Sequence, residues 1–129
     1  LTKNTKMRIA FILFIAALSV VMAACSKTDT VSGTYNGTLS GSGGPWNNYP
    51  SVITKIDDNK IKLSATINNF SWNDIVVTQT TTAGLYTLGS STAGSSCAGN
   101  FSSGSVNNNT LSWNVSGTCY GSYSFTGTK

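Results

Sequence analysis

Short runs of alternating apolar and polar residues recur between residues 33 and 128, and Asn, Asp or Gly separate one run from the next. No segment of this part of the chain keeps the 3.6-residue periodicity of an amphipathic helix. Such a pattern predicts strands joined by tight turns, as in a β-sandwich or a β-barrel. We expect eight strands, at about 33–40, 51–57, 60–67, 74–80, 84–90, 98–106, 110–116 and 121–128.

The first hairpin can be given a register from its turn. A two-residue turn at 58–59 places Ile56 opposite Ile61 on a mostly apolar face. The same register places Lys55 opposite Lys62. Because like charges directly opposed repel one another, that second face has to be solvated. The sequence therefore predicts a hairpin with one buried side.

The second hairpin is predicted to turn at Asn108-Asn109, with Val106 opposite Leu111. The strand that follows alternates cleanly, since Leu111, Trp113 and Val115 share one face and small polar residues occupy the other. This alternation is typical of a strand that is buried on one side only.

The N-terminus carries the pattern of an export signal. Residues 9–24 are apolar almost throughout, small residues close the run, and Lys3, Lys6 and Arg8 precede it. These three cations account for most of the formal net charge of +4, because the residues from Cys25 onward include five Lys and four Asp. An uncleaved membrane anchor is the alternative, but a span needs about 20 apolar residues.

The segment ends in Met22-Ala23-Ala24-Cys25, which resembles the lipobox of bacterial lipoproteins, with Met where the family prefers Leu. The resemblance implies that Cys25 is diacylated and becomes the first residue after cleavage. The lipid on this residue would then anchor the chain to a membrane. No Asp follows the Cys, which favours the outer membrane, at its periplasmic face or at the cell surface. The implied organisation is a signal peptide over 1–24, a lipidated Cys with a polar tether over 25–32, and a barrel domain over 33–129.

The two other cysteines are expected to form a disulfide. The register of the second hairpin puts Cys97 opposite Tyr120, one residue from Cys119. An exported location permits oxidation, and closing a loop of this length stabilises a fold by about 3 kcal/mol in the chain-entropy model. Two free thiols are the alternative. A zinc site is disfavoured, because zinc takes four ligands and the chain has no His.

Eight sequential strands with short connections favour an up-and-down antiparallel barrel, since closure removes exposed strand edges. The opening Gly33-Thr34-Tyr35 resembles the Gly-x-Trp that begins the first strand of lipocalins and avidins, with Tyr in place of Trp. The closing Tyr123-Ser124-Phe125 resembles the last strand of small calycin-like lipoproteins of Gram-negative bacteria. The resemblance implies a calycin or lipocalin-like barrel, and an eight-strand β-sandwich is the alternative.

Alternate connections of such a barrel share one end. The connections near 58–59, 81–83 and 107–109 are tight and polar, whereas those near 41–50, 68–73, 91–97 and 117–120 are longer. The longer connections carry five aromatic residues, Trp46, Tyr49, Phe70, Trp72 and Tyr120. We expect these rings to line an open mouth, where they could stack on an apolar ligand or a sugar face. The alternative is that the rings cover a barrel filled by its own side chains.

The residue types after Cys25 exclude much chemistry. Neither His nor Glu is available for acid–base catalysis, and Ser has no base to activate it, so we expect no enzyme activity and no catalytic residue. We also expect neither a metal nor a cofactor. Lys55, Lys60 and Lys62 adjoin Asp57 and Asp58, which indicates a solvated face and no binding of nucleic acid.

The leading hypothesis is therefore a lipid-anchored envelope lipoprotein, a small calycin-like barrel that binds a small apolar or glycan ligand at its aromatic end. The alternative hypothesis is a structural or protein-interaction module of the envelope, with a filled barrel and no ligand.

Overall fold

The computed structural model describes residues 26–66, 69–92 and 99–129. One short helix, α2 (Lys27–Val31), precedes the strands. Within the described ranges, no helix is long and apolar enough to cross a membrane. The strands are β1 (Gly33–Ser40), β2 (Trp46–Lys55), β3 (Lys60–Ala65), β4 (Phe70–Gln79), β5 (Leu85–Leu88), β6 (Ser91–Thr92), β7 (Asn100–Asn107), β8 (Thr110–Thr118) and β9 (Gly121–Thr128).

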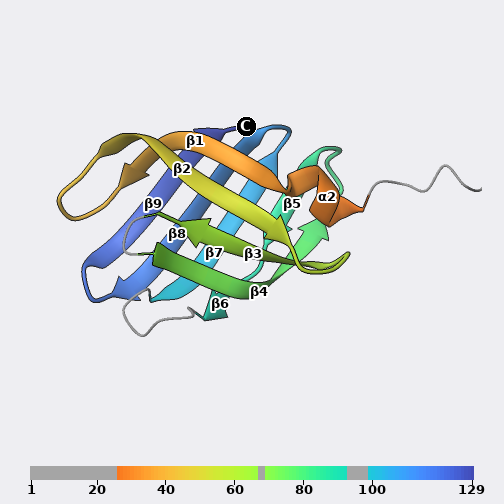
Figure 1. Ribbon diagram of the computed structural model, residues 1–129. Helices are drawn as coiled ribbons and strands as arrows, with labels where there is room; N and C mark the ends of the chain where they lie inside the picture. Colours follow the sequence, from red (N-terminus) through yellow and green to blue (C-terminus); the bar gives the residue numbers. More distant parts are fainter. Residues whose placement is uncertain (1–25, 67–68, 93–98) are drawn as a thin grey trace, which may run out of the picture.

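The strands form a closed antiparallel barrel (Figure 1). Leaving β6 aside, each strand pairs with the one that follows it, β5 with β7 included, and β1 pairs with β9, so eight strands complete the ring. The two-residue β6 pairs with β7 beside this ring. The predicted up-and-down barrel is thus confirmed, and the alternative β-sandwich is wrong.

The predicted register of the second hairpin is confirmed. Val106 lies opposite Leu111, as expected from a turn at Asn108-Asn109. A β-bulge between Phe101 and Ser103 then shifts the pairing of β7 with β8 by one residue. Cys97 lies outside the described residues, and the disulfide with Cys119 stays a prediction.

The predicted register of the first hairpin is wrong by one residue. Lys55 lies opposite Ile61 where Lys62 was expected, and Ile53 lies opposite Leu63. A shift of one residue exchanges the two faces of a strand, and Ile56 is accordingly 48% exposed. The cause lies in the turn, because the side chain of Asp57 accepts hydrogen bonds from the backbone N–H groups of residues 59 and 60 and so lengthens the connection.

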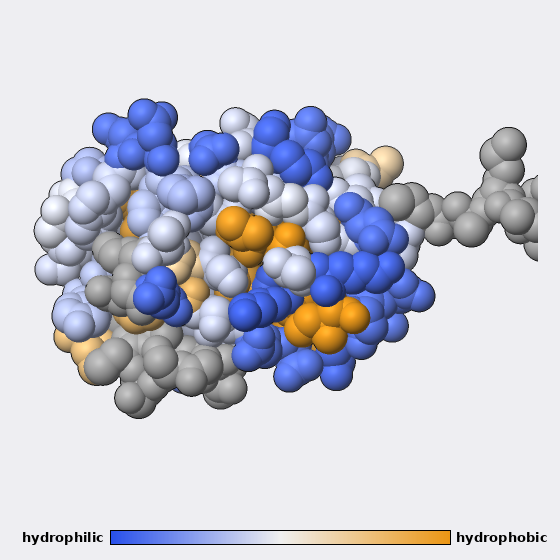
Figure 2. Space-filling view, in the orientation of Figure 1, coloured by the Kyte–Doolittle hydropathy of each residue, from blue (hydrophilic) through white to orange (hydrophobic). Residues whose placement is uncertain are grey.

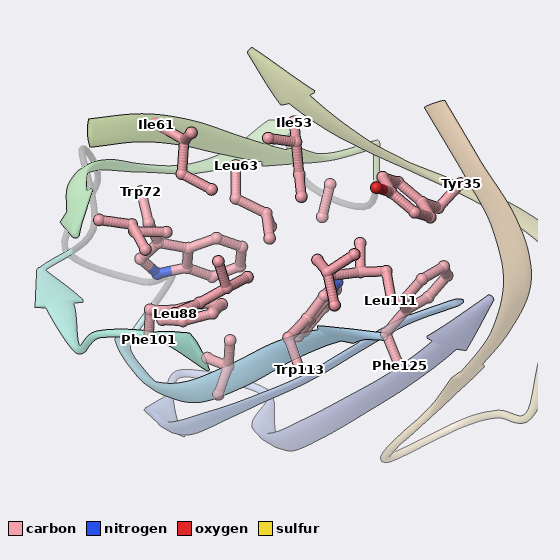
Figure 3. Close-up of a cluster of buried hydrophobic side chains, with 14 of the residues drawn as sticks. Tyr35, Ile53, Ile61, Leu63, Trp72, Leu88, Phe101, Leu111, Trp113 and Phe125 are labelled. Atoms are coloured by element: carbon pink, nitrogen blue, oxygen red, sulfur yellow. The ribbon is translucent and has the colours of Figure 1, made fainter. Parts of the chain in front are cut away.

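Apolar side chains from all eight barrel strands pack into one buried cluster (Figure 3). Its largest members are aromatic. The ring centroids are 5.7 Å apart for Trp72 and Trp113, which meet across the interior, and 5.5 Å apart for Trp113 and Phe125, which are paired on the adjacent strands β8 and β9. Phe101 continues this row beyond Trp72, at 6.0 Å. The interior is therefore built around a row of stacked and tilted rings.

The helix α2 occupies the segment predicted as a polar tether. Val31 and Thr28 are fully buried, and the hydroxyl of Tyr35 donates a hydrogen bond of 2.7 Å to the carbonyl oxygen of Val31. Ser26 is the N-cap residue, since its hydroxyl accepts a hydrogen bond from the backbone N–H of Asp29. The segment from Lys27 onward is consequently part of the folded domain.

An ion pair ties α2 to the barrel wall. The ammonium of Lys55 on β2 lies 3.1 Å from the carboxylate of Asp29. Two hydrogen bonds lower the pKa of the Asp29 carboxyl below its usual value. The one from the hydroxyl of Ser26 has the larger effect, and the one from the ammonium of Lys55 has the smaller. Because the folded state lowers this pKa, the pair stabilises the fold above the unfolded-state pKa, and the contribution is lost as the pH falls through the lowered value.

Candidate functional site

The up-and-down topology gives the barrel two different ends. We call one the α2 end, which consists of α2 and the connections 56–59, 80–84 and 108–109. The other is the far end, which is formed in the described chain by the connections 41–45 and 119–120, Thr66 and Asn69. This sorting of connections agrees with the one expected from the sequence, and it separates the candidate aromatic site from the N-terminal helix.

Phe70 and Trp72 do not lie in a loop at the mouth. Both belong to β4, which begins four residues earlier than predicted, and they are 3% and 0% exposed. The indole N–H of Trp72 donates a hydrogen bond of 3.1 Å to the carbonyl oxygen of Gly99. These two rings are members of the core, and a ligand at the barrel surface would not contact Trp72.

Trp46 and Tyr49 lie on β2, which also begins earlier than expected, and both are partly buried against the core. The ring of Trp46 is 6.2 Å from that of Tyr123. Gly44 lies beneath this indole, where a Cβ atom would come within 2.6 Å of the ring. The glycines of the 41–45 connection therefore make room for aromatic packing.

Tyr120 is the most exposed of the five predicted aromatic residues, at 52%. It occupies the β8–β9 turn, and its ring stacks on that of Phe70 at 6.5 Å. The far end thus combines one exposed ring, Tyr120, with the partly exposed Trp46 and Tyr49. The five predicted residues do not form a single surface.

A polar hollow of about 430 Å³ opens on the outer wall beside the far end. Its lining comes from β1 and the loop after it, β7, β8 and β9, and consists mainly of small polar side chains: Ser40, Gly41, Ser102, Asn114, Val115, Ser116, Ser122, Tyr123 and Ser124. These serines are not among the site residues predicted from the sequence. The polar half of the alternation in β8 and β9 is the sequence pattern that places them on the outer wall.

A second hollow, of about 300 Å³, lies on the wall formed by β2, β3 and β4. Its lining is mixed, since Val52 and Phe70 adjoin Lys62 and several polar residues. Figure 2 shows this side of the molecule, where hydrophobic patches lie among strongly hydrophilic ones. The two hollows therefore differ in chemistry, because only this one includes a charged side chain.

The charged residues of the described chain are unevenly placed. They lie on α2, on the β2–β3 hairpin, on β4 and at the C-terminal residue. Most are paired: Lys55 with Asp29 and Asp58, and Lys60 with Asp74. The described part of the far end and the strands β1, β5, β7, β8 and β9 carry no charged side chain.

Residues 26–66, 69–92 and 99–129 contain no group of three or more His, Cys, Asp or Glu side chains that could hold a metal ion. In comparisons with protein-family models, curated proteins and solved structures, nothing matches this chain. The candidate site therefore has to be interpreted from its own geometry, which is an uncharged far end with three accessible aromatic rings and a serine-lined hollow beside it.

Proposed function

We propose that this chain is a lipid-anchored, calycin-like lipoprotein of the bacterial cell envelope, whose barrel is a rigid binding module and whose contacts are made by its outer surface. The observation that carries this proposal is the row of aromatic rings in the interior. Trp72 and Trp113 are 0% and 1% exposed and contact each other across the barrel. Such an interior supports a structural role and disfavours a carrier with a ligand held inside.

The proposed anchor rests on the lipobox-like Met22-Ala23-Ala24-Cys25 and on the position of α2. If Cys25 is acylated, only Ser26 separates the lipid from a helix that packs against the barrel. Two or three acyl chains on one residue give stable attachment, whereas a single chain gives only reversible binding. The α2 end would then lie near the membrane and the far end would project from it.

The anchor is tested by replacing Cys25 with Ala in the full chain and labelling growing cells with radioactive or clickable palmitate. We expect the wild-type chain to be labelled, processed and recovered with the outer membrane. The variant should lose the label and keep its N-terminal segment, because the lipoprotein signal peptidase cleaves the peptide bond before a Cys whose sulfur is already acylated. A Cys119→Ala variant is the control and should keep the label. Label retained by the Cys25→Ala variant would overturn the proposed anchor.

A second candidate function is the binding of a short glycan at the far end, and the exposure of Tyr120 favours it. Flat aromatic faces stack on sugar rings, while nearby amides and hydroxyls fix the orientation of the sugar. Trp46 is the natural reporter, because the other two tryptophans are buried in the core. We expect a neutral oligosaccharide such as cellohexaose or chitohexaose to change the tryptophan emission. The change should disappear in a Tyr120→Ala variant, and an unaltered spectrum with every sugar would contradict this function.

A further inference from the structure

The outer face of four neighbouring strands carries a regular array of small polar residues. The strands β1, β9, β8 and β7 are adjacent in this order. Their registers align outward-facing residues in three rows of four, one residue from each strand. The rows are Asn36, Thr128, Thr110 and Asn107; Thr38, Thr126, Ser112 and Ser105; and Ser40, Ser124, Asn114 and Ser103. We call these twelve residues the polar grid.

The polar grid contains only hydroxyl and carboxamide side chains. The inward-facing neighbours on the same strands, such as Leu39, Phe125 and Trp113, are buried in the core. The opposite wall differs, since the outward positions of β2, β3 and β4 include Val52, Lys62 and Val76. The grid is therefore the more uniform of the two walls, because it carries neither a charged nor an apolar side chain.

The hydrogen-bonding capacity of the grid is mostly unused inside the protein. All twelve residues are exposed or half-buried. The side-chain hydrogen bonds of grid residues within the described chain are those between Ser112 and Thr126, at 3.4 Å, and from Thr38 to Asn47, at 3.2 Å. A hydroxyl both donates and accepts, and a carboxamide does the same through separate atoms. The grid thus offers many donors and acceptors on a rigid sheet.

From this array we propose that the polar grid is a docking surface for a neutral polysaccharide. A polymer rich in hydroxyl groups complements the donors and acceptors of the grid, and many weak contacts repeated along one chain add up. Other partners fit less well. Nucleic acids and anionic lipids require Lys or Arg, and the cores of protein interfaces are rich in aromatic residues and depleted in Ser.

The serine-lined hollow is a place where one sugar unit could fix the position of the polymer on the polar grid. Three residues of the third row, Ser40, Ser124 and Asn114, line it. A sugar unit seated there would contact hydroxyls and a carboxamide from three adjacent strands, while the rest of the polymer follows the grid. This inference rests on the proposed function only in using the outer surface of the barrel, and it does not depend on the lipid anchor.

The proposal is tested by co-sedimentation of the full-length protein, in detergent, with insoluble cellulose, chitin, starch and β-1,3-glucan. We expect at least one of these neutral polymers to retain the protein. A Ser124→Lys/Thr126→Lys double variant should reduce the bound fraction at least tenfold, because two long cations on β9, one of the two inner strands, block the face. Retention should change little between about 0.05 and 0.5 M NaCl, since no ion pair contributes to binding.

A Thr78→Lys variant is the matched control, because Thr78 is exposed on β4, on the opposite wall. It should bind like the wild-type protein, and all variants should show the wild-type thermal transition. Failure of all four polymers to retain the protein would overturn the proposal, as would undiminished binding of the double variant or loss of binding by the control. Palmitate labelling of the same preparation separates this result from the lipid anchor: labelled protein without retention refutes the polar grid alone.

Discussion

Replacing Trp113 with Ala is expected to lower the free energy of unfolding by about 3–5 kcal/mol, the usual cost of removing a large buried aromatic side chain. The side chain is 1% exposed and lies between Trp72 and Phe125 in the central row of rings. Its indole N–H donates a hydrogen bond of 2.9 Å to the hydroxyl of Ser51, which is itself fully buried. The variant would therefore create a cavity and leave a buried hydroxyl without this partner.

Denaturant unfolding followed by far-UV circular dichroism measures this loss. A Ser51→Ala variant separates its two parts, because it removes only the acceptor and should cost about 1–3 kcal/mol. A Trp46→Ala variant is the control for losing an indole from a partly exposed site. If Trp113→Ala cost no more than this control, the interior row of rings would not be the main source of stability, and the structural role proposed for the interior would fail.

Replacing Gly37 with Ala is expected to cost about 3 kcal/mol or more, above the usual range for overpacking, because the added atom would meet backbone. A Cβ atom at this position would overlap the carbonyl oxygen of Thr126 and the Cα atom of Gly127 on the neighbouring strand. Backbone cannot move aside as the end of a flexible side chain can. The contact between β1 and β9 closes the barrel, so we expect the variant to weaken the closure itself.

The matched control for this variant is Gly89→Ala. A Cβ atom there would approach no atom closer than 3.5 Å, which is an ordinary contact. Thermal unfolding should place the Gly89→Ala variant near the wild-type protein and the Gly37→Ala variant well below it, or show that the latter does not fold. Similar transitions for the two variants would mean that β1 and β9 are not held as closely as described.

The barrel could be predicted because its strands alternate and its turns are marked by Asn and Gly. The alternation in β8 and β9 predicts where both strands begin and the register with β7 near the turn, whereas β8 continues two residues past its predicted end, to Thr118. The predicted register of the first hairpin was wrong because of one side chain. Asp57 accepts two backbone hydrogen bonds in the turn, and this local chemistry changes the register without leaving a trace in the apolar pattern.

The candidate site was harder to predict, and β4 shows why. Phe70 and Trp72 face inward, and the next inward residue is Ile75, so the two-residue period is broken once. The extra residue lies at a register shift, near Asp74, whose φ is 56°. From the sequence, Asn73-Asp74 marked the start of a strand, and the two rings before it were assigned to a loop. The polar grid could not be predicted from the sequence, because its rows depend on how four strands are aligned with one another.

Lys129 joins the end of the last strand to the start of the first strand. The ammonium of Lys129 donates hydrogen bonds of 3.1 and 3.0 Å to the carbonyl oxygens of Thr30 and Ser32, beside the first strand. The first strand thus begins, and the last strand ends, at the α2 end of the barrel. Insertions or deletions in the connections of the far end would leave this junction unchanged. The far-end connections could therefore change in length or sequence while the position of α2 against the barrel stays the same.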